Sequence, residues 1–291
     1  MPTVAIVGVG AIGGVLAGLI HNAATHELTL CTRRPLSSLT VETPEGPVVV
    51  DARNITTPAE ATPVDWIFCA TKTYDAVSAA AWFPALTGPN TRLAVIQNGI
   101  EHRINFASFF PQELILPIII DVPAERRADG SVLQRGAASL KTEDTADGAD
   151  FAALFAGTLA KVELTPDFVT AAWAKLCINS AGVISALLLK PAGILRDEAL
   201  GEVAIDIIAE CVAVGRAEGA MLDDATGPRI LANYRAGSPD SINSLLADRL
   251  AGRDTEIEAR NGIIVRRGRQ HGIPTPANRM ALALFRAMVA G

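Results

Sequence analysis

The first half of the chain alternates short apolar runs with segments of helical periodicity. The runs are rich in β-branched and small residues, and they lie at 4–7, 27–31, 66–70, 92–96 and 114–120. Short, continuous apolar runs of this kind indicate strands that are buried on both faces, as in a parallel sheet covered by helices. Helices are expected at 11–20, from near Asp75, and at 147–159. The pattern predicts an α/β domain with a parallel sheet.

Three further strand features are expected in this half. Residues 39–51 contain the turn sequence PEGP between β-prone runs, which indicates a hairpin. A second hairpin is expected around Gly130 and Ser131, and 161–164 is expected to be a last edge strand.

From about Pro166 onward the periodicity becomes almost entirely helical. Helices are expected at 171–189, 201–218, 241–250, 255–271 and 276–289. We therefore expect two domains, an α/β domain at 1–165 and an all-helical domain at 166–291.

The sequence VAIVGVGAIGG places Gly8, Gly10 and Gly13 in G-x-G-x-x-G spacing directly after the first strand. The first glycine permits a tight turn, the second lets the backbone approach a pyrophosphate, and the third lets the helix pack close to the sheet. Ala11 and Ile12 open the helix, whose N–H groups and positive dipole end favour phosphate. The motif predicts a Rossmann-type dinucleotide site, with an ordinary tight turn as the alternative.

The end of the second strand indicates which dinucleotide fits. NAD sites usually carry an acidic side chain about 20 residues after the motif, but this chain has Thr32, Arg33 and Arg34 there. A guanidinium suits a 2′-phosphate, so Arg33 favours NADP(H). Two solvent-exposed arginines are the alternative.

Polar residues also follow two later strands. Lys72 comes after the strand at 66–70, and Asn98 after the strand at 92–96. Ligands of open α/β sheets bind at the carboxyl ends of the strands, so both residues could meet a cofactor or substrate. A surface lysine and a turn Asn-Gly explain them equally well.

In the helical half, Lys175 and Asn179 lie four residues apart and share one helix face. Because burying them among apolar residues is costly without polar partners, a ligand-binding cleft is one explanation. Ser241, Ser244 and Asp248 are expected on one face of a later helix. By itself, Glu256 is better explained as complementing the dipole of a helix that opens there, with Thr255 near the cap.

Composition narrows the class of protein. The 291 residues are 49% apolar and 19% charged, with net charge −6, which indicates a globular chain without a nucleic-acid or membrane partner. The basic pairs at 126–127 and 266–267 are interpreted as solvated surface. Four separated cysteines without C-x-x-C spacing indicate reduced core thiols in the cytoplasm, and we expect no metal. The uncharged segment 3–20 carries the glycine motif and no preceding cationic region, so it is interpreted neither as a membrane span nor as a signal sequence.

Several segments together resemble the ketopantoate reductase (2-dehydropantoate 2-reductase) family. They are GVGAIGG near the N-terminus, QNG at 97–99, WAKLCIN around Lys175, RDTEIEARNG at 253–262 and HGIPTPAN at 271–278. The resemblance extends over nearly the whole chain in the expected order. It implies a Rossmann domain joined to a helical domain, NADPH as hydride donor, and a 2-keto acid as substrate, with 2-dehydropantoate the leading candidate.

The resemblance also implies roles for individual residues. Lys175 would be the general acid and would share the catalytic centre with Glu256. Asn98 and Lys72 would line the nicotinamide end, and Asn98, Asn179, Ser244 and Glu256 would bind substrate. A cationic donor at the keto oxygen stabilises the alkoxide that develops there and supplies its proton.

This chain departs from the family pattern at two positions. Val183 and Gly193 stand where many members have asparagine, which leaves a bulkier or more apolar 2-keto acid open as substrate. A related two-domain hydroxyacid dehydrogenase and a non-catalytic NADP(H)-binding regulator are the alternatives. The long apolar helices are compatible with a homodimer, and a buried core explains them equally well.

Overall fold

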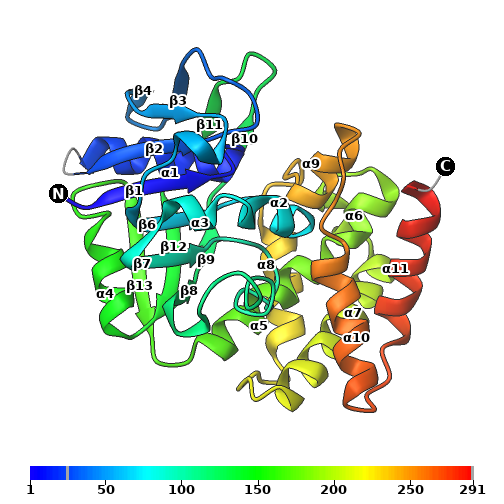
Figure 1. Ribbon diagram of the computed structural model, residues 1–291. Coiled ribbons are helices and arrows are strands. Elements are labelled where there is room, and N and C mark those ends of the chain that lie inside the picture. The colour runs from blue at the N-terminus through cyan, green and yellow to red at the C-terminus, as the bar shows by residue number, and fades with distance from the viewer. Residues whose placement is uncertain (24–25, 290–291) are drawn as a thin grey trace. The chain divides into compact units, whose positions relative to one another are not determined.

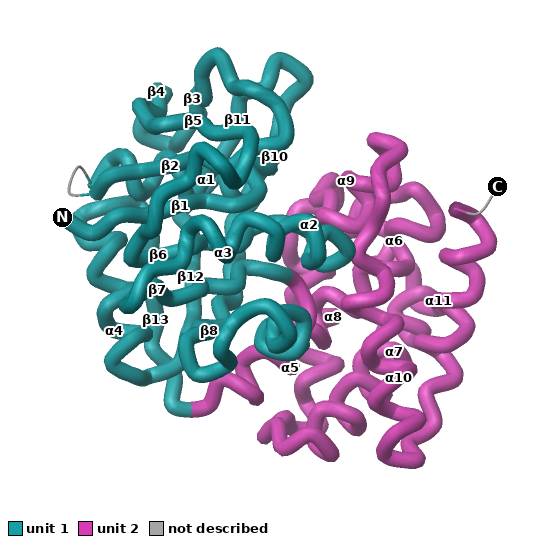
Figure 2. Tube along the Cα trace, viewed as in Figure 1, with its two compact units in different colours: residues 1–97, 101–166 teal, residues 98–100, 167–291 magenta. Residues whose placement is uncertain are grey.

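The computed structural model describes residues 1–23 and 26–289. The chain forms two compact units, shown in Figure 2: residues 1–97 with 101–166, and residues 98–100 with 167–291. The short segment 98–100 therefore belongs to the helical unit, although it follows a strand of the first unit.

The first unit is built on a six-stranded, entirely parallel sheet (Figure 1). Its order is β5 (Arg53–Ile55), β2 (Glu27–Cys31), β1 (Thr3–Val7), β6 (Val64–Cys69), β7 (Thr87–Val95) and β8 (Ile115–Pro117). Val4 and Ile6 pack into one core cluster and Ala5 and Val7 into another, so β1 is buried on both faces. The predicted parallel sheet is confirmed.

One side of this unit carries the first helix and a mixed sheet, in which β11 pairs parallel with β3. Helix α1 (Ala11–Ala23) packs against a four-stranded sheet of order β10 (Ala124–Arg126), β11 (Val132–Gln134), β3 (Leu39–Thr43) and β4 (Gly46–Val50). Both predicted hairpins are confirmed, because β3 pairs antiparallel with β4 and β10 with β11. A Cβ at Gly14 would lie 2.6 Å from the Val132 side chain, so α1 approaches this sheet closely.

A third sheet has the order β13 (Ala160–Thr165), β12 (Ala138–Glu143), β9 (Ile119–Asp121). The single strand expected at 114–120 is therefore wrong, because the chain passes from β8 in one sheet to β9 in another at buried Ile118.

The remaining helical elements of this unit are short. They are η1 (Pro58–Glu60), η2 (Thr73–Asp75), α2 (Ala76–Ala80), α3 (Phe83–Leu86), η3 (Gln112–Leu114) and α4 (Ala146–Ala153). The helix expected at 147–159 ends early, because residues 154–158 form successive tight turns.

The second unit is helical. It contains α5 (Phe168–Ala181), α6 (Val183–Leu188), η4 (Ala192–Arg196), α7 (Glu198–Ala217), α8 (Thr226–Ala236), α9 (Ser244–Leu250), the π-helical turn η5 (Glu258–Gly262), α10 (Ile263–Gln270) and α11 (Pro276–Val289). Its core joins α5 to α7, where Trp173 packs against Gly215. Helix α8 was not predicted, because its sequence TGPRILANYRA has a narrow apolar face in which Ile230 and Leu231 are the buried large residues.

Three predicted helices of this unit are divided or begin later than expected. The helix expected at 171–189 is divided at Gly182. The helix expected at 241–250 begins at Ser244, so Ser241 does not share its face. The helix expected at 255–271 begins with the π-helical turn at Glu258, so Thr255 and Glu256 precede it.

Residues 168–188 are long and apolar enough to cross a membrane by length and composition. The most apolar 18-residue stretch of this segment is 61% buried within the structure, as expected for core helices of a folded domain. The four cysteines are buried and free, as the sequence predicted.

Candidate functional site

The glycine motif forms the turn between β1 and α1, and two of its glycines are sterically required. Gly8 has φ +95°, and a Cβ there would lie 2.6 Å from the Thr71 side chain. A Cβ at Gly13 would lie 2.0 Å from the carbonyl oxygen of Gly8. Because Gly13 has no Cβ, the start of α1 can lie directly against the turn that follows β1.

Gly10 differs from the other two, because it is exposed and a Cβ there would meet no atom within 4 Å. The turn therefore leaves open space beside its second glycine. Ala11 and Ile12 follow in the first turn of α1, where N–H groups have no partner within the helix. This arrangement is typical of a phosphate-binding turn.

Arg126 contributes a cation to this turn that the sequence analysis did not recognise. Its guanidinium donates a hydrogen bond to the carbonyl oxygen of Val9, between the first two glycines. The interpretation of the 126–127 pair as solvated surface is therefore wrong for Arg126, which is partly buried, while Arg127 is exposed. Only the pairing of β10 with β11 brings Arg126 to the turn, so the local sequence held no signal for it.

Two arginines follow the end of β2, on a loop that is held by hydrogen bonds from Asn54. Asn54 on β5 donates hydrogen bonds to the Leu30 carbonyl and the Thr32 hydroxyl, at 3.1 and 2.8 Å. Arg33 and Arg34 follow, both exposed, and within the described part of the chain neither forms an ion pair. A free guanidinium at this strand end suits a phosphate group.

The ends of β6 and β7 are joined by Gln97. Its side-chain amide donates to the carbonyl oxygens of Thr71 and Lys72, at 3.1 and 3.4 Å. Behind it, the Nε2–H of buried His102 donates to the Gln97 carbonyl at 3.0 Å. Burial lowers the pKa of His102 to about 4, so its imidazole is neutral at physiological pH. Lys72 is partly buried at the start of η2.

In the second unit, a hydrogen-bonded chain joins three of the predicted substrate residues. The Asn98 amide donates to Oε2 of Glu256 at 2.8 Å, and the Asn179 amide donates to Oδ1 of Asn98 at 3.4 Å. Glu256 is 4% exposed. Because it precedes the π-helical turn, the first-turn dipole explanation does not apply to it.

Gly99 explains how Asn98 reaches these partners. It has φ +97°, and a Cβ there would lie 2.9 Å from the Ala259 carbonyl oxygen. Within the second unit, Gly99 therefore packs directly on the π-helical turn.

Lys175 and Asn179 lie one turn apart on α5, and both are partly buried. The helix begins after Asp167, whose carboxylate accepts a hydrogen bond from the Thr170 N–H at 2.9 Å. Trp173, Leu176 and Cys177 bury the other side of the helix in the core. The sequence-predicted polar face therefore exists on α5.

Ser244 is held by a residue that the sequence analysis did not single out. Ser244 is the first residue of α9 and is exposed, and its hydroxyl accepts a hydrogen bond from Nη2 of Arg260 at 2.6 Å. The preceding Asn243 caps α9, and its side-chain amide donates to the Gly182 carbonyl at 3.1 Å. Asp248, on the same helix, is buried and pairs with Arg253 at 3.0 Å.

Two buried asparagines connect α5, the π-helical turn and α11 through hydrogen bonds. The Asn261 amide donates to the Ser180 carbonyl on α5 and to Oδ1 of Asn278 on α11, at 3.1 and 2.9 Å. The Asn278 amide donates to the Ile207 carbonyl and to Glu210. Both asparagines are fully buried. Asn261 lies in the segment RDTEIEARNG and Asn278 ends the segment HGIPTPAN. Because both are buried and hydrogen-bonded within the protein, their role is structural.

The two positions that depart from the family pattern are enclosed. Val183 is fully buried in the helical core. Gly193 donates its N–H to the Pro239 carbonyl at 2.8 Å, and a Cβ there would lie 2.9 Å from the same residue. Neither position presents a polar side chain.

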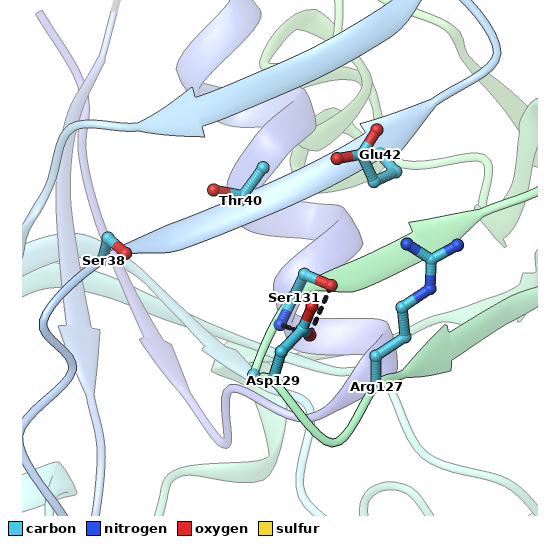
Figure 3. Close-up of a pocket in the computed structure, with 7 residues that line it drawn as sticks. Ser38, Thr40, Glu42, Arg127, Asp129 and Ser131 are labelled. Carbon is cyan, nitrogen blue, oxygen red and sulfur yellow. Dashed lines mark hydrogen bonds between the residues drawn. The ribbon is translucent and has the colours of Figure 1, made fainter.

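A separate polar hollow of about 260 Å³ lies on the four-stranded mixed sheet of the first unit (Figure 3). It is lined by Ser38, Thr40, Glu42, Arg127, Asp129, Gly130 and Ser131. Asp129 and Ser131 face each other there, and the Ser131 hydroxyl donates to Asp129 at 2.7 Å. None of the predicted site residues lines this hollow.

Comparison with known proteins identifies the family of this chain. The family model described as ketopantoate reductase PanE/ApbA matches residues 4–147, and that of its C-terminal domain matches residues 167–289. A 2-dehydropantoate 2-reductase of Caulobacter vibrioides is 48% identical over 287 residues, covering 99% of both chains. One of Mycobacterium tuberculosis is 35% identical, covering 98% of this chain and 97% of the relative.

Solved structures show the same fold. A PanE/ApbA family ketopantoate reductase from Ralstonia eutropha superposes with a TM-score of 0.90 at 34% identity, covering 99% of this chain and 98% of that one. A 2-dehydropantoate 2-reductase from Geobacter metallireducens superposes with a TM-score of 0.91 at 25% identity, covering 98% and 99%. Since both halves of the sequence match and full-length relatives exceed 30% identity, this chain belongs to the ketopantoate reductase family.

Proposed function

We propose that this chain reduces 2-dehydropantoate to pantoate with NADPH. The observation that carries the proposal is the chain of hydrogen bonds from Asn179 through Asn98 to buried Glu256, in a member of this family. Full-length relatives named 2-dehydropantoate 2-reductase support the same activity.

The residues of the first unit fit a phosphorylated dinucleotide. The open space beside Gly10 and the first turn of α1 would accept the diphosphate. Arg126 adds positive charge beside that turn, and exposed Arg33 would bind a 2′-phosphate. Lys72 would lie toward the nicotinamide end, where Asn98, a residue of the second unit, would also contribute. NADPH supplies a hydride when bound.

In the second unit, we assign the proton transfer to Lys175. Reduction of a 2-keto group places negative charge on its oxygen, and an ammonium at that oxygen both stabilises the charge and donates the proton. Glu256 would accept a hydrogen bond from a substrate hydroxyl. Its contact with Asn98 holds the carboxylate in one orientation. Asn179 and Ser244 would complete the binding of the keto acid.

A more apolar 2-keto acid is the second candidate substrate. Buried Val183 and closely packed Gly193 remove two side chains that could otherwise bind a polar substrate group. The loss leaves the assignment of Lys175 unchanged, because Lys175 lies on α5 whereas Val183 lies on α6 and Gly193 on η4.

The experiment is a substrate panel with the purified chain. NADPH oxidation is followed by absorbance for 2-dehydropantoate, for its analogue without the terminal hydroxyl, and for bulkier apolar 2-keto acids, each also with NADH. The proposal expects the highest kcat/KM for 2-dehydropantoate with NADPH. If kcat/KM is higher for an apolar 2-keto acid, that acid is the substrate in place of 2-dehydropantoate. If the chain binds NADPH tightly but reduces none of the acids, it is better explained as a non-catalytic regulator. Oxidation of 3-hydroxy acids would instead favour a related hydroxyacid dehydrogenase.

The remaining expectations concern location and assembly. Four buried, free cysteines are compatible with a reducing compartment, so we propose a cytoplasmic enzyme. A homodimer stays a prediction that sedimentation would test, because the apolar helix faces also form the core of the second unit.

A further inference from the structure

Arg260 places a positive charge inside the second unit, beside the proposed substrate residues. The residue is 2% exposed, and its Nη2 donates to the Ser244 hydroxyl at 2.6 Å. Its Nε is buried and has no hydrogen-bond partner. Among the residues that the structure describes, no carboxylate forms a direct ion pair with it.

A buried charge without a direct counter-ion is costly, and proteins normally pair such groups. Burial lowers the pKa of the Arg260 guanidinium, while the negative charges of Glu256 and Asp248 raise it. Both carboxylates have other direct partners, Asn98 for Glu256 and Arg253 for Asp248. They stabilise the guanidinium through space and leave its Nε unpaired.

The contact with Arg260 determines how Ser244 can hydrogen-bond. A guanidinium has donors only, so the Ser244 oxygen must be the acceptor. The hydroxyl proton of Ser244 therefore points away from Arg260, toward another acceptor. Ser244 is exposed, so that acceptor can be a ligand. The adjacent cation also makes the hydroxyl a stronger donor, because charge assistance strengthens hydrogen bonds.

We propose that Arg260 is a specificity-determining positioning residue, which acts through Ser244 to select the carboxylate of the 2-keto acid. The proposal rests on the reductase activity proposed above and assigns a function to a residue within the RDTEIEARNG segment that neither motif nor spacing singled out. A carboxylate accepts a hydrogen bond from the Ser244 hydroxyl and partly neutralises the charge of the buried cation. A carboxamide at the same place is a weaker acceptor and carries no charge.

The experiment is a double-mutant cycle with ligands that differ in this one group. Wild type, Arg260→Gln, Ser244→Ala and the double variant are titrated with pantoate and with pantoamide in the presence of NADP⁺, and KM and kcat are measured with 2-dehydropantoate. Arg260→Lys is included as the variant that keeps the charge.

We expect each single variant to raise the Kd for pantoate by roughly 10- to 100-fold, as for loss of a charge-assisted hydrogen bond. The double variant should bind about as weakly as either single variant, because both remove the same interaction. For pantoamide the changes should stay below about 3-fold, because no charge-assisted bond is lost. In Arg260→Gln, KM should rise more than kcat falls. Arg260→Lys should recover part of the preference for pantoate.

Three results would overturn the inference: additive losses in the double variant, equal losses for pantoate and pantoamide, or a lower kcat at unchanged KM. Thermal unfolding and NADPH binding report whether each variant is folded. If Arg260→Gln does not fold, the test rests on Ser244→Ala, because Ser244 is exposed. An unchanged preference of this variant for pantoate over pantoamide contradicts the proposal.

Failure of the proposed function gives a different result. If wild type reduces another 2-keto acid instead of 2-dehydropantoate, the cycle is repeated with that acid's hydroxy product and its amide. If wild type reduces no 2-keto acid, the inference about Arg260 fails together with the function.

Discussion

The two regions assigned to cofactor and substrate are built in different ways. The turn after β1 is made of backbone and glycines within residues 8–13, where sterics at Gly8 and Gly13 fix its shape. The cluster in the second unit is made of side chains from residues 98, 179, 244, 256 and 260. The first region is local in the sequence, and the second exists only after distant segments have packed.

This difference predicts different responses to mutation. A backbone-built turn fails when a side chain is added, because the space for the turn is lost. A side-chain cluster fails when a functional group is removed, while the surrounding helices remain folded.

Lys175→Ala should lower kcat by about 10²- to 10⁴-fold, the range for removing a general acid. NADPH affinity should change little, because the glycine turn belongs to the other unit. Steady-state kinetics and NADPH titration measure the two effects. Lys161→Ala, at an exposed lysine of β13, is the control. Equal activity of the Lys175 and Lys161 variants would remove Lys175 from the mechanism.

Gly13→Ala should reduce the free energy of unfolding by about 3 kcal/mol, at the upper end for overpacking. The added Cβ would lie 2.0 Å from a backbone oxygen, which must shift. Gly10→Ala is the matched variant, because its Cβ would meet no atom. It should keep wild-type stability and bind NADPH more weakly. Denaturant unfolding and cofactor titration separate the two, and similar stability losses in both would contradict this account of the turn.

His102→Gln should change how stability depends on pH. The folded pKa of about 4 is below the usual value of 6.5, so the unfolded chain binds more protons between these limits. Stability from this group is therefore complete above pH 6.5 and is lost as pH falls toward 4, by about 3 kcal/mol. Urea unfolding across this range should show the wild-type advantage over the variant shrinking as pH falls. A constant difference would mean that His102 titrates normally.

Arg33→Ala should raise the Kd for NADPH by about 10-fold and leave that for NADH nearly unchanged, because only NADPH carries the 2′-phosphate. Binding of both cofactors by fluorescence titration measures the ratio. Arg127→Ala, at another exposed arginine of the first unit, should change neither value. Equal losses for both cofactors would show that Arg33 does not bind the 2′-phosphate.

Elements that depend on neighbouring residues were predicted accurately from the sequence, and elements that depend on distant contacts were not. The residues of β1 and β2 and the start of α1 were identified within a residue or two, because apolar runs and glycines encode them locally. Helix α8 was missed, since its contacts with α7 and not its own periodicity keep it folded. The strand at 114–120 was predicted as one element, because nothing in an apolar run indicates a change of sheet at Ile118.

By itself, the sequence determined the parallel sheet, the glycine turn, the helical second half and the family to which the chain belongs. Local sterics and hydrophobic periodicity are sufficient for these features. Only the tertiary structure decided that Asn98 bonds to Glu256, that Arg126 reaches Val9 and that Arg260 lies beneath Ser244. These contacts join residues between 16 and 158 positions apart, and a hydrogen bond over such a separation depends on the packing of whole elements.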